Sequence, residues 1–532
     1  MTLKVSNIRL GLDESEASLP QKLAERLGVG ADAIARWRIL RKSLDARRRD
    51  EIRFVYAAEV ELPADEAALA RRGLGPDVAP LVAEGFSWPE PGRAPLEHRP
   101  VVVGAGPAGL FAAYFLARDG YRPLVLERGR AVKDRVADVR RFDAGGPLDP
   151  ESNYLFGEGG AGTFSDGKLT SRGAGPDVRR VLEVLVDCHA KPSIRYEHRP
   201  HLGSNRLPLV VRTLRRQLED LGGEVRFSCR VEDLEIGAGR LRGLLTSSGR
   251  VAADVAVLAV GHSARDTYQM LLRRGVPLMP KAFQLGARIE HPQPQINEVR
   301  YGAAAEHPAL GAADYELAVR AGRHDLFTFC MCAGGFVMPS VSEPGYFCTN
   351  GMSESRHDSP FATSGLVVTI RPEDTGSRHP LAGVHFQQRA ERLAYLAGGR
   401  SYRAPLQWAR DFLAGRPSRG SLPTSYPRGT VAYDLGAILP PIVSEALERG
   451  LPLLDRPFHG LFLKDATLTG PEARGSSPVR IPRDDPSREC PALPGLYPCG
   501  EGAGFAGGII SAAVDGLRTA RALVARYARP SG

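Results

Sequence analysis

Two cysteines, Cys330 and Cys332, are the residues of this sequence with the most direct redox chemistry. A pair of thiols can exchange electrons with a bound cofactor or with a disulfide in a substrate. If the surrounding segment is a β-strand, residues two apart point to the same face, so the two thiols would point together. The alternative is that both are small apolar side chains of a buried strand. That alternative is favoured, because free cysteines are usually core residues.

A second set of candidate catalytic residues follows a glycine-rich stretch, FGEGGAGTFSDGKLTSR, which runs from Phe156 to Arg172. Ser165, Asp166 and Lys168 are the polar side chains at its end, and Lys168 could hold a carboxylate or tune the charge of a cofactor. Further along the chain, the stretch SESRHDSP could bind an anionic substrate or transfer a proton, although a polar surface turn explains it equally well. Its charged or titratable members are Glu354, Arg356, His357 and Asp358.

These groups point to chemistry that needs a cofactor. The sequence has no Ser-His-Asp order typical of hydrolases, and it has no CxxC pair or zinc-ligand spacing, so no metal site is predicted. The glycine-rich stretch also lacks the Gly-Lys-Ser/Thr ending of a P-loop. A flavin, in contrast, carries out hydride chemistry itself. The protein needs only to bind it, orient it and set the charge around its ring.

A dinucleotide site is predicted where Gly104, Gly106 and Gly109 form a GxGxxG motif between the apolar stretch RPVVV and an alanine-rich helix. The first glycine allows the tight turn, the second lets the backbone approach the pyrophosphate, and the third lets helix and strand pack closely. Glu127 follows the second strand, 18 residues after Gly109, where an acidic side chain takes the ribose hydroxyls. An acid at this place disfavours NADP.

Three features favour FAD over NAD. The C-terminal stretch LYPCGEGAGFAGGIISAAVDGLRTA resembles the second flavin-contact segment of the glutathione-reductase-like flavoproteins, in which an acid meets the ribitol and a helix N-terminus points at the flavin. The stretch VLAVGHS resembles a strand of the same superfamily, and no second strand–GxGxxG–helix unit is present. Such flavoproteins also place a glycine-rich loop against the flavin ring, the role implied for FGEGGAGTFSDGKLTSR, which could otherwise be a phosphate nest or a surface loop.

The residues expected to contact FAD come from the glycine motif and from these resembling segments. They are Gly104, Ala105, Gly106, Pro107, Ala108, Gly109, Glu127, Arg128, Gly159, Gly160, Ala161, Gly162, Thr163, Val231, Gly261, Gly500, Glu501, Gly507, Gly508 and Ile509.

Nearly the whole chain resembles a family of uncharacterised bacterial FAD-dependent (NAD(FAD)-utilising) dehydrogenases of the glutathione-reductase-like superfamily. The matching stretches include RKSLDAR, VVVGAGPAGLFAA, FGEGGAGTFSDGKL, KAFQLGARIEHPQ, NGMSESRHDSPFA and YPCGEGAGFAGGIISAAVDG. The resemblance implies an FAD fold with an inserted substrate-side domain, but it does not supply a substrate. One departure lies in PEARGSSPVRI, where threonines are expected around the arginine, so a hydroxyl role near Arg474 is in doubt.

The elements that must position these residues predict an α/β fold in four segments. Alternating strands and one helical pattern in residues 1–95 indicate a small α+β domain, which a Pro-rich linker ends. Residues 96–280 read as the first part of a Rossmann-type FAD domain, and residues 281–480 as an inserted, mainly antiparallel β domain with helices. Residues 481–532 return to the FAD domain with a strand, a glycine-rich loop and a long helix.

Composition limits the class of protein. The 532 residues are 43% hydrophobic and 25% charged, as in globular proteins, and no apolar run reaches the ~18 residues of a membrane helix. The N-terminus has no signal-like apolar region, and the seven cysteines do not suggest a disulfide framework, so a cytoplasmic protein is expected. The net charge of +9 comes from arginines spread along the chain, with one cluster at Arg47, Arg48 and Arg49.

The leading functional prediction is an FAD-dependent oxidoreductase acting on a small-molecule substrate, with NAD(P)H as a transient visitor to the flavin. An FAD-containing protein that binds nucleic acid or a protein partner is one alternative, based on the positive charge and the N-terminal arginines. A flavin-linked disulfide reductase is another, and it depends on Cys330 and Cys332 alone. The electron donor, the oligomeric state and the role of residues 1–95 stay open.

Overall fold

The structure is a computed structural model, and it describes residues 2–63, 75–82, 84–170 and 173–530. Ser171 and Arg172, at the end of the predicted glycine-rich loop, lie outside the described residues. Within the described residues, no helix has the length and apolar content that crossing a bilayer requires.

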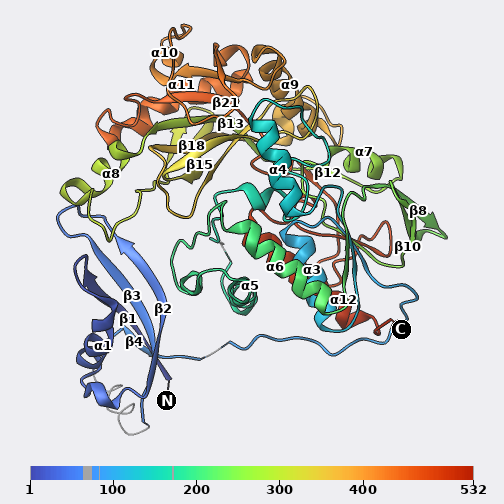
Figure 1. The fold of residues 1–532 in the computed structure, drawn as a ribbon, viewed down its shortest axis with the longest axis horizontal. Coiled ribbons are helices and arrows are strands. Elements are labelled where there is room, and N and C mark those ends of the chain that lie inside the picture. The colour runs from blue at the N-terminus through green and yellow to red at the C-terminus, as the bar shows by residue number, and fades with distance from the viewer. Residues whose placement is uncertain (1, 64–74, 83, 171–172, 531–532) are drawn as a thin grey trace.

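The N-terminal part of the chain is a four-stranded antiparallel sheet, in the order β2-β3-β1-β4, with one helix packed on it (Figure 1). Alternate residues of β1, such as Leu3 and Val5, are buried against Leu19 and Leu23 of α1, as one-sided burial of a sheet requires. The elements are β1 (Thr2–Gly11), α1 (Leu19–Leu27), β2 (Arg36–Asp45), β3 (Arg53–Glu61) and β4 (Val78–Pro80).

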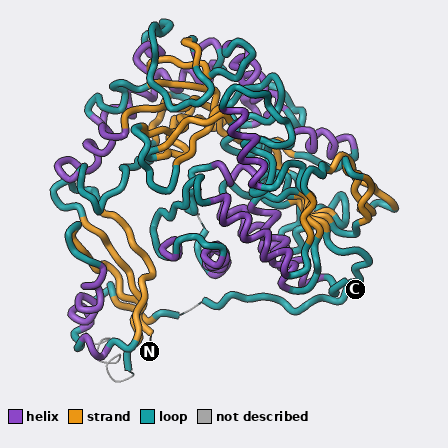
Figure 2. The backbone as a smooth tube through the Cα atoms, viewed as in Figure 1, coloured by secondary structure: helices purple, strands orange, loops and turns teal. Residues whose placement is uncertain are grey.

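A long loop segment joins this sheet to the rest of the molecule (Figure 2). It runs beside the end of α12 (Ile509–Arg526), where Gly92 N donates to Val524 O at 2.8 Å and Ala94 N donates to Arg526 O at 3.0 Å. A second contact is made by β2, whose Lys42 N donates to Tyr196 O at 2.8 Å. The N-terminal sheet therefore touches the rest of the described chain at its β2 edge as well as through the linker.

A five-stranded parallel sheet, in the order β23-β11-β5-β6-β7, forms the Rossmann-type centre. Its side chains alternate between two cores: Val102 packs toward α3, α5, α6 and α12, whereas Val101 and Val103 pack toward a three-stranded sheet and α7. Burial on both faces explains why the central strands are wholly apolar. The strands are β5 (Val101–Val103), β6 (Leu124–Leu126), β7 (Glu224–Arg226), β11 (Ala256–Leu258) and β23 (Leu496–Pro498).

The layers around this sheet come from distant parts of the sequence. The helices are α3 (Pro107–Arg118), α4 (Val132–Asp143), α5 (Pro176–Asp187), α6 (Leu207–Asp220), α7 (Arg265–Arg273) and α12. The three-stranded sheet consists of β8 (Val231–Gly237), β9 (Arg240–Thr246) and β10 (Gly249–Ala252).

The inserted part is a seven-stranded sheet, in the order β14-β15-β18-β13-β21-β19-β20, with helices around it (Figure 1). All its neighbouring strands are antiparallel except β19 and β20, which are parallel. The strands are β13 (Phe283–Pro292), β14 (Ala318–Ala321), β15 (His324–Cys332), β18 (Phe361–Ile370), β19 (Ala404–Trp408), β20 (Thr430–Ala432) and β21 (Thr467–Glu472). Its helices are α8 (Gln293–Tyr301), α9 (Ala382–Ala397), α10 (Ala409–Leu413) and α11 (Pro441–Asp455).

Two short pairs complete this part: β16 (Gly335–Pro339) with β17 (Thr349–Ser353), and β12 (Met279–Pro280) with β22 (Val479–Arg480). The mixed α/β class with a Rossmann-type nucleotide domain, predicted from the sequence, is confirmed. A buried ion-pair network links the Rossmann-type part to the inserted part. Glu391 of α9 pairs with Arg265 of α7 at 2.8 Å and with Arg474 at 3.0 Å.

Candidate functional site

The GxGxxG turn connects β5 to α3. At two of its three glycines, neighbouring atoms leave no room for a side chain. Gly104 has a φ of +102°, and a Cβ there would lie 2.5 Å from Ala259 O. A Cβ on Gly109 would lie 1.9 Å from Gly104 O. Gly106 differs, because the nearest atom to its Cβ would be Gly160 Cα at 4.0 Å. The second glycine therefore faces open space beside the helix N-terminus, which is where a pyrophosphate can approach the backbone.

The second glycine-rich loop lies directly against this turn. Gly159 N donates to Ala105 O at 2.8 Å, and a Cβ on Gly160 would lie 3.1 Å from Gly106 Cα. A Cβ on Gly162 would lie 3.4 Å from Pro107 and 3.5 Å from Ile509, the first residues of α3 and α12. The loop thus meets both helix N-termini, although 400 positions of sequence separate those helices.

The C-terminal segment closes the same site. Helices α3 and α12 pack side by side, and a Cβ on Gly516 of α12 would lie 2.1 Å from Ala108 O (Figure 1). Gly508, with a φ of +116°, precedes α12, and neither it nor Gly507 has an atom within 4 Å of an added Cβ. Two helix N-termini with partial positive charge therefore lie beside uncrowded glycine backbone, a cradle that suits the phosphates and flavin of FAD.

Glu127 holds the backbone of this cradle in place through hydrogen bonds. Its buried carboxylate accepts hydrogen bonds from the backbone N–H groups of Ala105 (2.7 Å), Gly129 (2.9 Å) and Gly157 (2.9 Å). It thereby fixes the turn, the end of β6 and the glycine-rich loop relative to one another. The contact with a ribose that its place in the sequence suggests stays a prediction.

Three other residues that were expected to contact FAD lie in different environments. The Arg128 guanidinium is paired with Glu151 at 2.7 Å and Asp266 at 3.0 Å. Val231 begins β8, opposite Thr246. Gly261 has a φ of +71° and no atom within 4 Å of an added Cβ.

An arginine that the sequence pattern did not single out supports the loop. Arg135 of α4 is fully buried, and its guanidinium donates to the carbonyl oxygens of Asn153 (2.8 Å), Tyr154 (2.9 Å) and Glu158 (2.8 Å). A buried guanidinium that donates to three carbonyls fixes their orientation, since an unmet donor would be costly. No local sequence signal marks Arg135 for this task.

Glu501, the acid predicted at the ribitol, has two titratable neighbours that the sequence did not link to it. Its Oε1 lies 3.6 Å from His262 Nδ1, and His262 Nε2 is hydrogen-bonded to Arg474 O at 3.0 Å. Burial raises the pKa of Glu501 to about 7, and the charge of Lys281 only partly offsets this. Burial, with help from Arg474 and Arg265, lowers the pKa of His262 to about 4. His262 is therefore neutral at pH 7, while Glu501 exchanges a proton near that pH.

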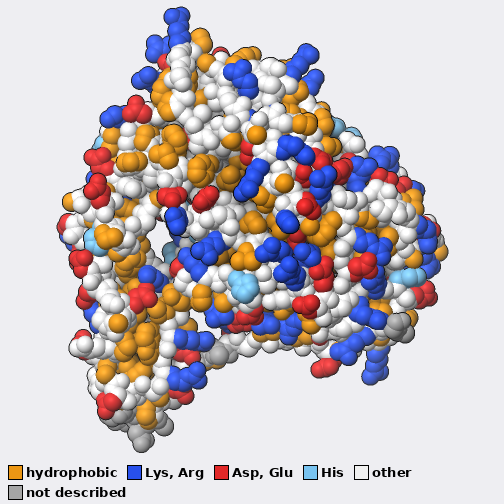
Figure 3. Space-filling view, viewed as in Figure 1, with side chains coloured by type: hydrophobic (Ala, Val, Ile, Leu, Met, Phe, Trp, Pro, Cys, Tyr) orange, Lys and Arg blue, Asp and Glu red, His pale blue; other side chains and the backbone are white. Residues whose placement is uncertain are grey.

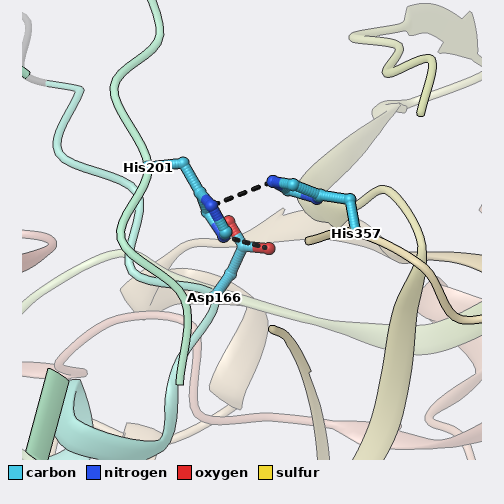
Figure 4. Close-up of side chains that lie close together, drawn as sticks. All are labelled: Asp166, His201 and His357. Atoms are coloured by element: carbon cyan, nitrogen blue, oxygen red, sulfur yellow. Dashed lines mark hydrogen bonds and ion pairs between the residues drawn. The ribbon is translucent and has the colours of Figure 1, made fainter. Parts of the chain in front are cut away.

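The predicted loop also delivers Asp166 to a group of four hydrogen-bonded residues, Asp166, His201, Ser353 and His357, which we call the histidine relay. Figure 4 shows three of them, Asp166, His201 and His357. Ser353 Oγ donates to Asp166 Oδ1 at 2.5 Å and is 2.9 Å from His201 Nε2. His201 Nδ1 is 2.9 Å from His357 Nε2, and His357 Nδ1 is 2.7 Å from Ala333 O. Asp166 and His201 come from the Rossmann-type part, whereas Ser353 and His357 come from β17 and the loop after it.

Counting protons along the histidine relay gives its charge. His357 Nδ1 must donate to the Ala333 carbonyl, so neutral His357 accepts at Nε2 from His201. The Ser353 hydroxyl donates its proton to Asp166, so it can only accept from His201. The Nε2 of His201 must therefore also carry a proton, which it donates to Ser353 Oγ. Every contact is satisfied when His201 carries two protons and Asp166 none. Burial would raise the pKa of Asp166, but the charges of Lys168 and His201 outweigh it and lower that pKa.

Lys168, a predicted catalytic residue, borders the relay. Its Nζ lies 3.5 Å from Asp166 Oδ2 and donates to Met331 O, and 37% of its side chain is exposed. Burial would lower the pKa of Lys168, but Asp166 outweighs it and raises that pKa. Ser165 instead stabilises the loop, since its Oγ donates to Gly162 O at 2.8 Å and accepts from Gly167 N at 3.2 Å.

Sequence reasoning missed His201 and did not single out Ser353. Within SESRHDSP, Ser353 and His357 reach the relay. Glu354, Arg356 and Asp358 are exposed around it. The ligand-type atoms of Asp166, His201 and His357 lie within 4.8 Å of one another, a spacing that could hold a metal ion. The Lys168 ammonium beside Asp166 and the complete hydrogen-bond pattern favour proton transfer over metal binding.

The expectation that Cys330 and Cys332 point together is wrong. A bulge between Phe329 and Cys332 breaks the alternation of β15, and Cys330 has a φ of +44°. As a result Cys330 is exposed while Cys332 is buried, with its Sγ 3.2 Å from Cys330 O. Burial raises the pKa of the Cys332 thiol. Protonated thiols are poor nucleophiles, so the disulfide-reductase alternative loses its geometric basis.

Arg474, where a hydroxyl role was in doubt, is a buried structural residue. Its guanidinium pairs with Glu391 and donates to Ser342 Oγ at 2.8 Å. Two of the three N-terminal arginines are also paired: Arg47 with Asp45 at 2.7 Å and Arg48 with Asp50 at 3.0 Å.

Family models match along the chain in agreement with this geometry. Residues 102–159 match an NAD(P)-binding Rossmann-like domain, residues 203–311 an FAD dependent oxidoreductase, and residues 282–475 an FAD-dependent protein, C-terminal domain-like. Residues 2–61 match a domain of unknown function.

Similar proteins were found over most of the chain, and none of them gives a substrate for it. An uncharacterised protein of Clostridium beijerinckii is 41% identical over 534 residues, with 100% of both chains covered. The L-proline dehydrogenase of P. horikoshii is 12% identical over 82% of this chain and 92% of its own, with a TM-score of 0.31. Glycine oxidase of Bacillus cereus is 11% identical over 80% and 94%, with a TM-score of 0.29. The full-length match and the family models place this chain in the family of the Clostridium protein, as an FAD-dependent oxidoreductase.

Proposed function

We propose that this oxidoreductase is a dehydrogenase whose small organic substrate binds where the Rossmann-type part meets the seven-stranded sheet. The histidine relay supports this most, because it supplies acid–base groups beside the glycine-rich loop. Asp166 follows Gly162 by four residues, so the relay begins where the predicted flavin contacts end. Both halves of the protein contribute to it, which is how substrate sites between domains are commonly built.

Bound FAD supplies the hydride acceptor or donor for such a reaction. The chain's own residues must handle the accompanying proton. When the substrate is reduced, doubly protonated His201 gives up one proton. When the substrate is oxidised, that proton must already have left, so that neutral His201 can take up the proton that the substrate loses. Asp166 and His357 keep it oriented from opposite sides, since Asp166 stabilises the imidazolium through Ser353 and His357 accepts from Nδ1.

Lys168 points to the charge of the substrate. Its ammonium is partly exposed next to the relay, so it can pair with a carboxylate of the substrate while Asp166 holds it in place. Hydroxy acids and amino acids combine a carboxylate with an adjacent carbon that can lose a hydride, and they are therefore the proposed substrate class. NADH or NADPH is the proposed electron partner, as a transient visitor, because the one βαβ nucleotide unit recognised in the sequence, at Gly104, Gly106 and Gly109, is assigned to FAD.

A rapid-mixing experiment tests this proposal. The FAD-loaded wild type and the His201→Asn variant are mixed without oxygen with a panel of hydroxy acids and amino acids, and the flavin absorbance is followed. We expect at least one compound to bleach the wild type. We expect His201→Asn to keep its FAD and to react at least ~10²-fold more slowly, the usual share of a general acid–base group.

A matched control is His379→Asn, which changes an exposed histidine and should behave as wild type. Equal rates for His201→Asn and wild type would show that His201 does not handle the proton. If NADH or NADPH bleaches the wild type while no acid on the panel does, the proposed substrate class is wrong.

A further inference from the structure

A cavity at the far end of β15 is separate from the relay. It has a volume of about 420 Å³, and its lining residues are Arg320, Gly322, Arg323, His324, Asp325, Thr369 and Arg371. A smaller cavity of about 230 Å³ adjoins it at Arg323 and His324 and is bounded by α11. Six residues of strand separate His324 from Cys330, roughly 20 Å at the usual rise. We call the pair the arginine cavity.

The arginine cavity has more positive than negative charge. The guanidinium groups of Arg320, Arg371 and Arg449 line it, and among the described residues none of the three has an ion-pair partner. Arg323 has one distant contact, 4.0 Å from Asp374. The acids that line it are Asp325 and Glu445, so two carboxylates stand against four guanidinium groups. Unpaired like charges gathered in one place repel each other and favour an anion between them.

His324 provides an independent sign of a missing ligand. Its residue is 8% exposed, and its Nε2 is buried without a hydrogen-bond partner among the described residues. Native proteins rarely leave a buried polar atom unpaired, and a bound ligand or an ordered water usually accounts for one. His324 lines both cavities, so it stands in the wall between them and can offer an N–H to an acceptor there.

The hairpin turn shapes the rim of this cavity. Gly322 lies between β14 and β15 with a φ of +88°, a conformation that favours glycine. A Cβ there would lie 2.6 Å from Arg449 Nη1, so the bare turn leaves room for that guanidinium beside the cavity. Thr369, on neighbouring β18, adds a hydroxyl to the lining.

We propose that the arginine cavity binds a small phosphate-bearing anion. Guanidinium groups match phosphate oxygens with paired N–H donors, and several around one volume suit a ligand with more than one negative charge. The volume falls in the range of small-molecule sites, whereas its lining is far more polar than theirs, as an anion requires. This site is distinct from the FAD cradle, which uses helix N-termini and glycine backbone.

Calorimetric titration of the FAD-loaded protein with sodium pyrophosphate tests the proposal. We expect one saturable site per chain whose affinity falls at least tenfold in the double variant Arg320→Ala/Arg371→Ala. Both side chains are exposed, so the variant should fold, as circular dichroism and an unchanged flavin spectrum would verify. A His324→Phe variant should weaken binding too, because the ring stays but its N–H donor is lost.

Arg216→Ala is the matched control, since Arg216 is exposed on α6 and has no ion pair among the described residues. It should bind pyrophosphate as wild type does. The proposal is overturned if no saturable heat is seen, if the double variant binds equally well, or if Arg216→Ala loses as much affinity. Binding of an RNA oligonucleotide without binding of pyrophosphate would also overturn it, because a diffuse basic surface would then be the explanation.

Discussion

Glu501 combines a largely enclosed carboxyl with a place at the start of the glycine-rich segment that precedes α12. A carboxyl whose pKa is raised by folding binds its proton more tightly in the folded protein than in the unfolded one. Its ordinary value is 4.5, and burial raises the pKa of Glu501 to about 7. The folded state therefore loses stability as the pH rises from about 4.5 to about 7, by roughly 3 kcal/mol at most, and the loss levels off above pH 7.

Glu501→Gln removes this titration. We predict that the free energy of unfolding of the variant, relative to wild type, rises between pH 4.5 and pH 7, because other carboxyls titrate equally in both proteins. Urea unfolding at several pH values measures the difference. Glu373→Gln, at an exposed glutamate, should give a constant difference. A constant difference for Glu501→Gln as well would mean that the carboxyl titrates normally.

At the scale of single elements, the bulge in β15 determines which thiol can react. All seven cysteines lie within the described residues, and Cys330 alone is exposed. We predict that a thiol reagent modifies one cysteine of the native protein, because the six other thiols are buried. Cys330→Ser should abolish this reaction, whereas Cys332→Ser should leave it unchanged. Rapid reaction of two thiols would contradict the bulged geometry.

The junction of α7 and α9 depends on one buried acid. Glu391 is wholly buried and pairs with both Arg265 and Arg474. Removing its charge leaves Arg474 without an ion-pair partner among the described residues and leaves Arg265 only its longer contact with Glu343, at 3.4 Å. Glu391→Gln should therefore lower the free energy of unfolding by about 3–5 kcal/mol. Denaturant unfolding measures this.

The matched surface substitution Asp50→Asn breaks the exposed pair with Arg48 and should leave the free energy of unfolding nearly unchanged. Equal effects of Glu391→Gln and Asp50→Asn would show that the network does not hold the junction.

At the scale of the whole molecule, the surface gives little support to a nucleic-acid-binding protein. On the face shown in Figure 3, positive and negative side chains are mixed rather than separated. The N-terminal cluster follows the same pattern, because Arg47 and Arg48 have acidic partners within three residues. The net charge of +9 thus spreads over the chain, and the arginine cavity is a local exception.

The features that can be predicted from the sequence are those encoded within one short segment of the chain. The GxGxxG motif, the glycine-rich loop and the C-terminal helix can each be recognised from about 20 consecutive residues. In the structure these three segments lie against one another. The relay has no such signal, because Asp166 and Ser353 are 187 positions apart and meet only through the packing of two sheets. The bulge at Cys330 has the same origin, since alternation is overridden by pairing with β18.

The central claim is that FAD occupies the cradle formed by three glycine-rich segments, and Gly106 tests it most directly. An added Cβ there would meet nothing closer than 4.0 Å, so Gly106→Ala should fold, yet it would fill the space that the pyrophosphate needs. The measurement is the visible spectrum of purified wild type, Gly106→Ala and the control Gly311→Ala, whose Cβ lies in the open. We predict a flavin band near ~450 nm in wild type and in the control, and none in folded Gly106→Ala. A colourless wild type that cannot take up FAD, or an equally yellow Gly106→Ala, would contradict the account.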